Sequence, residues 1–428
     1  MALMAFDNRQ VQQTTLPNGL IVVTEPMPHV RSVSAGIWIR TGARSESAEL
    51  AGISHFIEHM VFKGTSRRSA EDIAREVDSV GGMVDAFTAK EMVCFSTRVL
   101  DEHLEAVFDV LADMVLDPQF PEDEIIRERS VILEEIRMVE DSPEDLVHEM
   151  FSRNLWGHHP LGRPILGTME TVGRFDRGAI HPAFRRWYAP NNIVITAAGN
   201  VSHRRILDLV VPRFGDRAPA HNGHAEIPPA PIAELGSRSK RELEQVHICI
   251  GVPSCSMTDP RRYAVSVLNN LLGSGMSSRL FQNIREKQGL AYAIFSETNY
   301  YRDAGMLSIY AGTSLETAER LITSVTKELR DLKENRVTPE ELRRCKANLK
   351  GGTLLSLEST GSRMSDLARQ YLYFGTYTSP EERIAAMEAV TAEEIQQLAQ
   401  EMFQPSRAAA AILGNLNGFK LQPTHLAC

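Results

Sequence analysis

The chain has 428 residues, of which 43% are hydrophobic and 24% are charged. This ordinary globular composition excludes a disordered chain, and at roughly 100–200 residues per domain the length predicts two to four domains. The net charge of −9 argues against a nucleic-acid-binding surface as the main function, so we expect no nucleic-acid partner.

Two further features concern the cellular environment. Five cysteines form no Cys-x-x-Cys pair, which predicts free thiols in a reducing compartment; they stand at positions 94, 249, 255, 345 and 428. The first residues contain no apolar core of signal-peptide length, and no apolar run in the chain is long enough to span a bilayer. We therefore expect a cytoplasmic protein with no membrane span.

Hydrophobic periodicity predicts strands and helices that alternate unevenly. In the first half we expect, in chain order, a strand at 33–42, a helix at 47–62, a strand at 93–99 and helices at 102–115 and 121–140. In the second half we expect a strand at 247–254, a helix at 259–272, a strand at 306–312 and helices at 315–333 and 339–357. Because strands also occur as neighbours, this order favours an α+β fold with mainly antiparallel sheets covered by helices.

An internal duplication is the clearest feature of the chain. FRRWYAPNNIVITAAGN at 184–200 and AQEMFQPSRAAAAILGN at 399–415 share an aromatic residue two positions before a proline, followed by a run that ends in Gly-Asn. The segments that begin FPEDE at Phe120 and TPEEL at Thr338 repeat at nearly the same offset. We therefore predict two homologous halves, 1–215 and 241–428, joined by a proline-rich linker at 216–240.

The first candidate site is a histidine pair. Residues 54–60 are Ser-His-Phe-Ile-Glu-His-Met. On the expected helix, His55 and His59 share one face, and this spacing lets two imidazoles reach a single metal ion at ~2.0–2.1 Å. Glu58 lies on the same broad face. The helix is apolar around most of its circumference, so we expect the polar stripe to be buried in a site. The alternative interpretation is that the two histidines belong to a generic polar stripe of the helix and bind no metal.

Catalytic zinc takes a third protein ligand, and the helix expected at 121–140 offers carboxylates. Glu128 and Glu135 lie two turns apart on the same side, whereas Glu134 points about 100° away. The spacing selects this pair over Glu134 but does not decide which of the two binds metal. The alternative for each glutamate is a solvated salt bridge with a neighbouring arginine. Five other histidines have no metal-ligand spacing and are expected to be structural or surface residues: His103, His148, His158, His159 and His181.

HFIEHMVFKGT at 55–65 resembles the inverted zinc motif of the pitrilysin/insulinase metallopeptidases, the inverzincins. The resemblance covers essentially the whole chain and is strongest to bacterial relatives of the β subunit of the mitochondrial processing peptidase. The family places its third ligand at the position of Glu135 and a further glutamate at that of Glu128. The resemblance therefore implies one Zn²⁺ per chain, held by His55, His59 and Glu135, with Glu58 as general base and Glu128 orienting a histidine ligand.

The second half resembles the family as well. RLFQNIREKQGLAYAIFS at 279–296 is similar to the segment that supplies an arginine and a tyrosine seven residues apart, here Arg285 and Tyr292. The resemblance implies that both bind the peptide and help to stabilise the tetrahedral oxyanion. The alternative for Arg285 is a solvated side chain near a helix end at Gly289. The second half contains no HxxEH motif, so it is expected to be metal-free.

GGMVDAFTAKEMVCFST at 81–97 resembles the substrate-binding edge strand of the family. A peptide would add to this strand through main-chain hydrogen bonds. The substrate-binding residues implied by the resemblance are Asp85, Ala86, Phe87 and Thr88. The family usually has Asn where this chain has Asp85. The aspartate adds a negative charge at this position and puts any Asn-specific substrate contact in doubt.

These features predict a zinc-dependent endopeptidase that cleaves oligopeptides or unfolded, presequence-like segments. The resemblance implies two halves that face each other across a peptide-binding chamber. Some relatives are non-catalytic core subunits of respiratory complexes, but they usually lack part of the ligand set that this chain keeps. A peptidase that requires a partner subunit is a third interpretation. Relatives of this length often pair, so we expect a homodimer.

Overall fold

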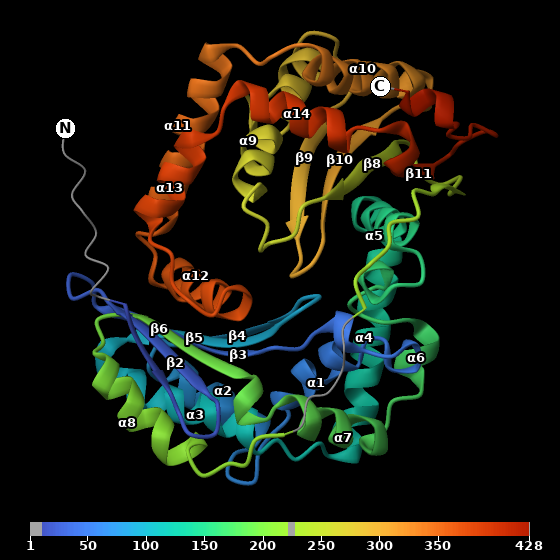
Figure 1. Ribbon diagram of the computed structural model, residues 1–428. Helices are drawn as coiled ribbons and strands as arrows, with labels where there is room; N and C mark the ends of the chain where they lie inside the picture. The colour runs from blue at the N-terminus through green and yellow to red at the C-terminus, as the bar shows by residue number, and fades with distance from the viewer. Residues whose placement is uncertain (1–10, 221–226, 428) are drawn as a thin grey trace. The chain divides into compact units, whose positions relative to one another are not determined.

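The chain forms two compact units in the computed structural model, which describes residues 11–220 and 227–427 (Figure 1). Of the described residues, the first unit comprises 11–137, 164–220 and 354–379. The second comprises 138–163, 227–353 and 380–427. The expectations that concern residues 1–10, linker residues 221–226 and Cys428 lie outside the described residues.

The first unit contains a six-stranded sheet in the order β1-β2-β6-β3-β5-β4. β2 and β6 run parallel, and every other neighbouring pair is antiparallel. β4 forms one edge of the sheet, so its outer backbone groups have no strand partner among the described residues. The strands are β1 (Gln12–Thr15), β2 (Ile21–Pro26), β3 (Ser32–Ile39), β4 (Met83–Thr88), β5 (Val93–Leu100) and β6 (Ile193–Gly199).

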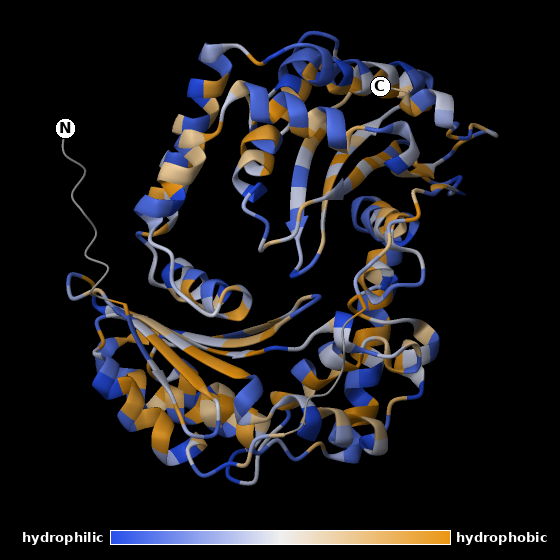
Figure 2. Cartoon of the chain, in the orientation of Figure 1, coloured by the Kyte–Doolittle hydropathy of each residue, from blue (hydrophilic) through white to orange (hydrophobic). Residues whose placement is uncertain are grey.

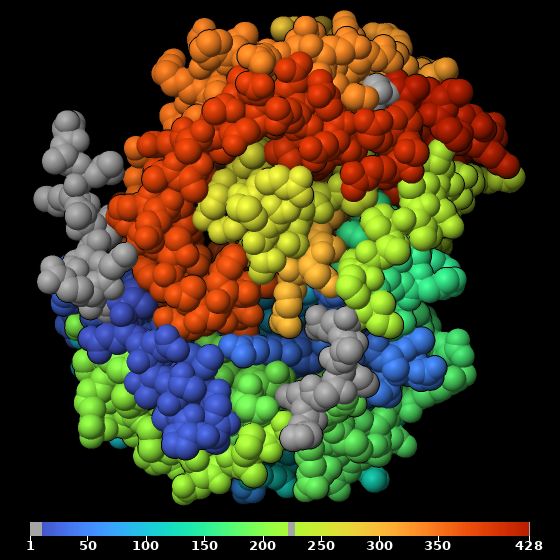
Figure 3. All heavy atoms as spheres, in the orientation of Figure 1, coloured from blue at the N-terminus to red at the C-terminus, as the bar shows by residue number. Residues whose placement is uncertain are grey.

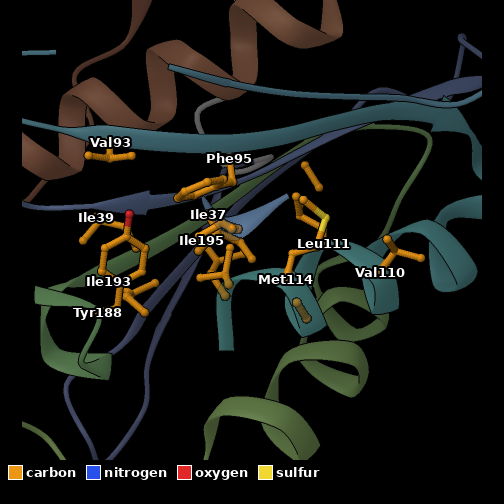
Figure 4. Packing of buried hydrophobic residues seen from close by; sticks show 14 of the residues in the cluster. Ile37, Ile39, Val93, Phe95, Val110, Leu111, Met114, Tyr188, Ile193 and Ile195 are labelled. Atoms are coloured by element: carbon orange, nitrogen blue, oxygen red, sulfur yellow. The ribbon is translucent and has the colours of Figure 1, made fainter. Parts of the chain in front are cut away.

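Helices cover both faces of this sheet, because side chains alternate along each strand and both sets are apolar (Figure 2). On one face, Ile37 and Phe95 pack with residues of α3 (Leu104–Leu116) (Figure 4). On the opposite face, Trp38 packs against α12 (Thr360–Tyr373). The other helices are α1 (Ile53–Val61), α2 (Ala70–Asp78), α4 (Glu122–Asp141), α6 (Met169–Gly173), α7 (Arg177–Trp187) and α8 (His203–Phe214).

The second unit contains a five-stranded sheet in the order β7-β11-β8-β10-β9, in which only β7 and β11 are parallel. The strands are β7 (Leu235–Ser239), β8 (Val246–Ser254), β9 (Ala293–Tyr300), β10 (Gly305–Thr313) and β11 (Ala409–Gly414). The helices are α5 (Pro143–Trp156), α9 (Arg262–Leu272), α10 (Leu315–Glu334), α11 (Pro339–Ser356), α13 (Pro380–Ala389) and α14 (Ala392–Met402). In the space-filling view, α13 and α14 lie at the surface of this unit (Figure 3).

The element order confirms an α+β fold built from two homologous halves. In each unit the strand that ends in Gly-Asn lies between a parallel and an antiparallel neighbour: β6 in the first sheet and β11 in the second. Both of these strands follow a short 3-10 turn that begins at the repeated proline, Pro190 or Pro405. The expected strands and helices agree with the structure to within three residues at each end, apart from the helix expected at 47–62.

The two halves of the sequence exchange one helix each. α5 belongs to the first half of the chain but packs on β8 and β11 of the second sheet. α12 belongs to the second half but packs on β2, β3 and β6 of the first sheet. α12 begins 217 residues after α5, at position 360 against 143, close to the repeat offset. The compact units therefore do not follow the expected boundaries 1–215 and 241–428.

Two local expectations also differ from the structure. The helix expected from residue 47 begins only at Ile53. The residues before it form a separate 3-10 turn, η3 (Ala48–Leu50), and Gly52, which directly precedes α1, has a left-handed φ of +95° that interrupts the helix. β7 lies inside the linker expected at 216–240. Its sequence, LGSRS, lacks the β-branched and alternating pattern that would have indicated a strand.

The structure also bears on the membrane and cysteine expectations. Among residues 11–220 and 227–427, no helix has the length and apolarity needed to cross a membrane. The four described cysteines are free thiols: Cys94, Cys249, Cys255 and Cys345.

Candidate metal centre

Helix α1 carries two histidines on one face. Its apolar residues Phe56, Ile57 and Met60 are fully buried against the core of the first unit. His55 and His59 project from the remaining stripe, and their ring centroids lie 4.5 Å apart. The i, i+4 spacing therefore brings the two imidazoles together, as the sequence predicts.

Glu135 of α4 lies against both imidazoles. Its Oε2 is 3.7 Å from Nε2 of His55 and 3.7 Å from Nε2 of His59. One ligand atom from each residue lies within 4.8 Å of the other two, and the described part of the chain holds no other such group of three. Ligands at ~2.0–2.1 Å from a tetrahedral zinc ion lie about 3.3–3.4 Å apart, close to the two 3.7 Å separations between Glu135 and the histidines.

The protonation and hydrogen bonding of these groups suit a cation. Burial, with a smaller effect from His59, lowers the pKa of His55 to about 3, so its imidazole is neutral at neutral pH and free to donate a lone pair. Oε2 of Glu135 and Nδ1 of His55 are buried and have no hydrogen-bond partner among the described residues. A buried carboxylate oxygen without a donor is costly unless a cation binds it. Two imidazole nitrogens and a carboxylate oxygen fit Zn²⁺.

Glu128 holds the outer nitrogen of one imidazole. Its Oε2 lies 3.0 Å from Nδ1 of His59, and its Oε1 lies 2.5 Å from Nζ of Lys63. A carboxylate at Nδ1 fixes the tautomer that leaves Nε2 of His59 directed at Glu135. The sequence indicated Glu128 but not Lys63, which lies beyond the last residue of α1. The only signal for Lys63 was its position four residues after His59.

Glu134 points away from this group, as its position on the helix predicts. It pairs with Arg137 at the surface, and its side chain is 67% exposed, against 34% for Glu135. The solvated salt bridge with an arginine, which was the alternative for these three glutamates, therefore applies to Glu134 but not to Glu128 or Glu135. The five other histidines with no expected metal role join no metal-binding group in the described residues.

Glu58 lies next to the two histidines and is buried. The hydroxyl of Thr88 donates a hydrogen bond to Oε2 of Glu58 over 2.5 Å. Burial raises the pKa of Glu58; the Thr88 hydrogen bond and His59 oppose this effect, and the charges of Asp85 and Glu135 add to it. A carboxylate with a raised pKa is a better proton acceptor, which suits a general base.

The four residues expected to bind substrate lie on the edge strand β4. Asp85 and Phe87 are exposed on one face of the strand, whereas Ala86 and Thr88 face α1. The backbone N–H of Ala86 donates to Oδ1 of Asp85 over 2.9 Å. The inner edge of β4 pairs with β5, which leaves the outer edge without a strand partner in the described chain.

Arg285 and Tyr292 lie together in the second unit. Arg285 is near the end of a short π-helix, η7 (Phe281–Glu286), and Tyr292 directly precedes β9. The guanidinium of Arg285 is 5.1 Å from the centre of the Tyr292 ring and 4.6 Å from that of Phe281. The Tyr292 side chain is 81% exposed. These two residues belong to a different unit from the histidines, so their shared role with the metal centre stays a prediction.

Comparison with known proteins supports the same class of site. A family model described as insulinase (peptidase family M16) matches residues 21–169, and one described as peptidase M16 inactive domain matches residues 174–349. A Bacillus subtilis (strain 168) protein named "Uncharacterized zinc protease YmxG" is 42% identical over 402 residues, covering 94% of this chain and 98% of its own. A Rickettsia bellii (strain RML369-C) protein named "Uncharacterized zinc protease" is 36% identical over 409 residues, with coverages of 94% and 98%.

Two solved structures share the fold. A protease from Helicobacter pylori superimposes with a TM-score of 0.88 at 23% identity, covering 94% of this chain and 99% of its own. A structure described as a peptidase M16 inactive domain from Pseudomonas fluorescens gives a TM-score of 0.87 at 22% identity, with coverages of 94% and 98%. At these identities the likeness concerns the fold alone.

Proposed function

Because this chain belongs to the insulinase family, peptidase family M16, we propose that it is a zinc-dependent endopeptidase that cleaves oligopeptides or unfolded, presequence-like segments. One observation carries the proposal. Nε2 of His55, Nε2 of His59 and a carboxylate oxygen of Glu135 converge within 4.8 Å, with the buried Glu58 beside them.

His55, His59 and Glu135 would hold one zinc ion per chain. When bound, zinc supplies a Lewis acid that polarises the peptide carbonyl and acidifies water. Glu128 keeps His59 in the tautomer whose Nε2 faces the metal, and Lys63 holds Glu128 in place through an ion pair.

Glu58 is the proposed general base. Its carboxylate takes the proton from the attacking water and passes it to the nitrogen of the leaving amine. The Thr88 hydroxyl fixes one carboxylate oxygen, so the orientation of Glu58 is set before substrate arrives. The raised pKa of Glu58 favours capture of the proton from the attacking water, the first step of this transfer.

The substrate is proposed to bind as an added strand along the outer edge of β4. Alternate residues of the segment Asp85, Ala86, Phe87 and Thr88 would contribute main-chain hydrogen bonds at this edge, and such bonds are sequence-tolerant. Arg285 and Tyr292 are proposed to approach from the second unit, which is expected to be metal-free, and to bind the peptide and donate to the tetrahedral oxyanion. The chamber between the units and the homodimer stay predictions.

Hydrolysis of a quenched fluorescent peptide library by zinc-loaded wild-type protein and by Glu58→Gln tests this function. We expect the wild type to cleave alone, and Glu58→Gln to bind the same amount of zinc but to lose about 10²–10⁴ in kcat. Equal turnover by both proteins would exclude Glu58 as the base. Zinc-loaded wild type without activity would instead favour a non-catalytic subunit or a peptidase that requires a partner.

Tyr292→Phe tests the contribution of the second unit in the same assay. We expect unchanged zinc content and a kcat lowered by about 10²–10³, the usual effect of removing one transition-state donor. Wild-type kcat in this variant would remove Tyr292 from the proposed mechanism.

A further inference from the structure

A buried segment, Gly42–Glu46, connects the metal-binding helix with the turn between β4 and β5. It contains the short 3-10 helix η2 (Ala43–Ser45) and contacts α1. Its two charged residues, Arg44 and Glu46, are each only 4% exposed. Charged side chains are almost never buried this completely unless they are paired, so the partners of these two residues indicate what the segment does.

Glu46 binds the beginning of α1. Its Oε2 accepts the backbone N–H of Gly52 and its Oε1 accepts that of Ser54, both over 2.7 Å. Gly52 precedes the helix and has no side chain with which to cap it. Glu46 therefore satisfies two N–H groups that the helix leaves without partners, at the positive end of the helix dipole.

Arg44 anchors the same segment to the β4–β5 turn. Its Nη1 lies 2.6 Å from Oε1 of Glu91, and the two side chains are 2% and 4% exposed. The backbone N–H of Ala43 donates to the carbonyl of Ala89 over 3.1 Å, and that of Arg44 donates to the carbonyl of Lys90 over 2.8 Å. The segment is thus fixed to the turn by a buried ion pair and two backbone hydrogen bonds.

The same helix and the same hairpin meet a second time, because Thr88 at the end of β4 donates to Glu58 in α1. The helix is therefore tied to the hairpin near both of its ends. His55 directly follows Ser54 in the first turn of α1, so the place of its imidazole depends on where the helix begins.

We propose that Glu46 is a positioning residue of the metal centre, which sets the first turn of α1 and thereby the imidazole of His55. Arg44 and Glu91 carry this effect to strand β4 by holding the segment against the hairpin. The proposal rests on the zinc site described under the proposed function. It requires that loss of the Glu46 contacts weakens zinc binding in a protein that remains folded.

Zinc affinity, measured by competition with a chromophoric chelator, tests the proposal without reference to turnover. Glu46→Gln keeps the size of the side chain but replaces one acceptor oxygen with an NH₂ group that faces a backbone N–H. We expect the Kd for zinc to rise about 10-fold, at the lower end of the effects seen for groups that orient metal ligands. Circular dichroism and thermal melting establish that each variant is folded at the temperature of the titration.

The chain offers a matched control in the same unit. Arg363 forms a buried ion pair with Glu25 where α12 packs on the first sheet, and it also donates to the carbonyl of Leu357. Arg363→Met removes a buried charge on α12, which packs on β2, β3 and β6. We expect it to lower the melting temperature but to change the Kd for zinc by less than about twofold, as for an independent site.

A pair of double variants covers the case in which Glu46→Gln does not fold. Arg44→Met with Glu91→Met removes both members of the ion pair, and Arg363→Met with Glu25→Met removes both members at the control site. We expect the first double variant to weaken zinc binding by about 3- to 10-fold, within the effects of ligand-orienting groups, and the second to leave it unchanged.

The outcomes separate this proposal from the proposed function. Wild-type protein that binds no zinc would overturn the function itself. Tight zinc binding by the wild type, with equal Kd values for the Glu46 variant and its control, would overturn only the positioning role of Glu46. If Glu46→Gln does not fold, equal Kd values for the two double variants would have the same consequence.

Discussion

The hydroxyl of Thr88 donates a 2.5 Å hydrogen bond to Oε2 of Glu58. Thr88 ends the edge strand β4, and Glu58 lies between the two histidines in the sequence of α1. This one bond therefore joins the strand proposed to bind the peptide with the carboxylate proposed to act as base. A charge-assisted hydrogen bond of this kind contributes about 1.5–3 kcal/mol.

Thr88→Val tests whether this bond orients the base. Valine has the shape of threonine but no hydroxyl, so we expect kcat to fall roughly 10- to 100-fold, while KM and zinc content stay near wild-type values. Thr88→Ser is the control, because it restores the hydroxyl, and it should recover most of the rate. Equal kcat for the valine and serine variants would show that the hydrogen bond plays no part in turnover.

Glu128→Gln tests the support of His59. The neutral amide lacks the negative charge that pairs with Lys63 and strengthens the hydrogen bond from Nδ1 of His59. We therefore expect zinc affinity to fall about 10- to 100-fold. Glu124→Gln is the matched control on the same helix, since Glu124 pairs only with the exposed Arg127 in the described chain. Zinc titrations that give the same Kd for both variants would contradict the role of Glu128.

Much of the site follows from spacing within single helices. His55 and His59 lie four residues apart, and the two-turn spacing in α4 separates Glu128 and Glu135 from Glu134, as the structure has them. The choice of Glu135 over Glu128 as metal ligand came from the family resemblance, because helix geometry treats the two alike. Contacts between distant segments left no such periodic signal in the sequence.

Two features illustrate that limit. The cap that Glu46 forms on α1 joins residues six positions apart across the short 3-10 turn η3, and no local pattern marks the partner of a buried acid. The exchange of α5 and α12 could not be predicted from the sequence either. The amphipathic pattern of a helix indicates that the helix packs on an apolar surface, but it does not indicate which of two similar sheets provides that surface. The duplication supplied two such sheets, and the expected boundary at residue 215 assigned each helix to the half in which it occurs.

The helix exchange predicts that the first half of the chain is not stable alone. A fragment of residues 1–215 lacks α12, whose Met364, Leu367 and Tyr371 cover Trp38 and Val194. Each of these buried side chains contributes about 1.5–3 kcal/mol, so several kcal/mol of packing would be lost. We expect the fragment to bind a hydrophobic dye and to melt at least about 10 °C below the full chain.

Full-length protein cleaved at a protease site inserted near residue 216 is the control for that fragment, since it keeps α12. We expect it to melt close to the intact chain. A fragment 1–215 that melts with the same midpoint as the intact protein would mean that α12 is dispensable for the first sheet.

The most direct measurement is the zinc content of three purified proteins: wild type, Glu135→Gln and Glu134→Gln. The two glutamates are neighbours in sequence, but only Glu135 reaches the imidazoles, while Glu134 pairs with Arg137 in solvent. We expect about one zinc per chain in the wild type and in Glu134→Gln, and little or none in Glu135→Gln after dialysis against a chelator. Two zinc ions per chain in the wild type, or equal zinc loss in the two variants, would contradict the site formed by His55, His59 and Glu135.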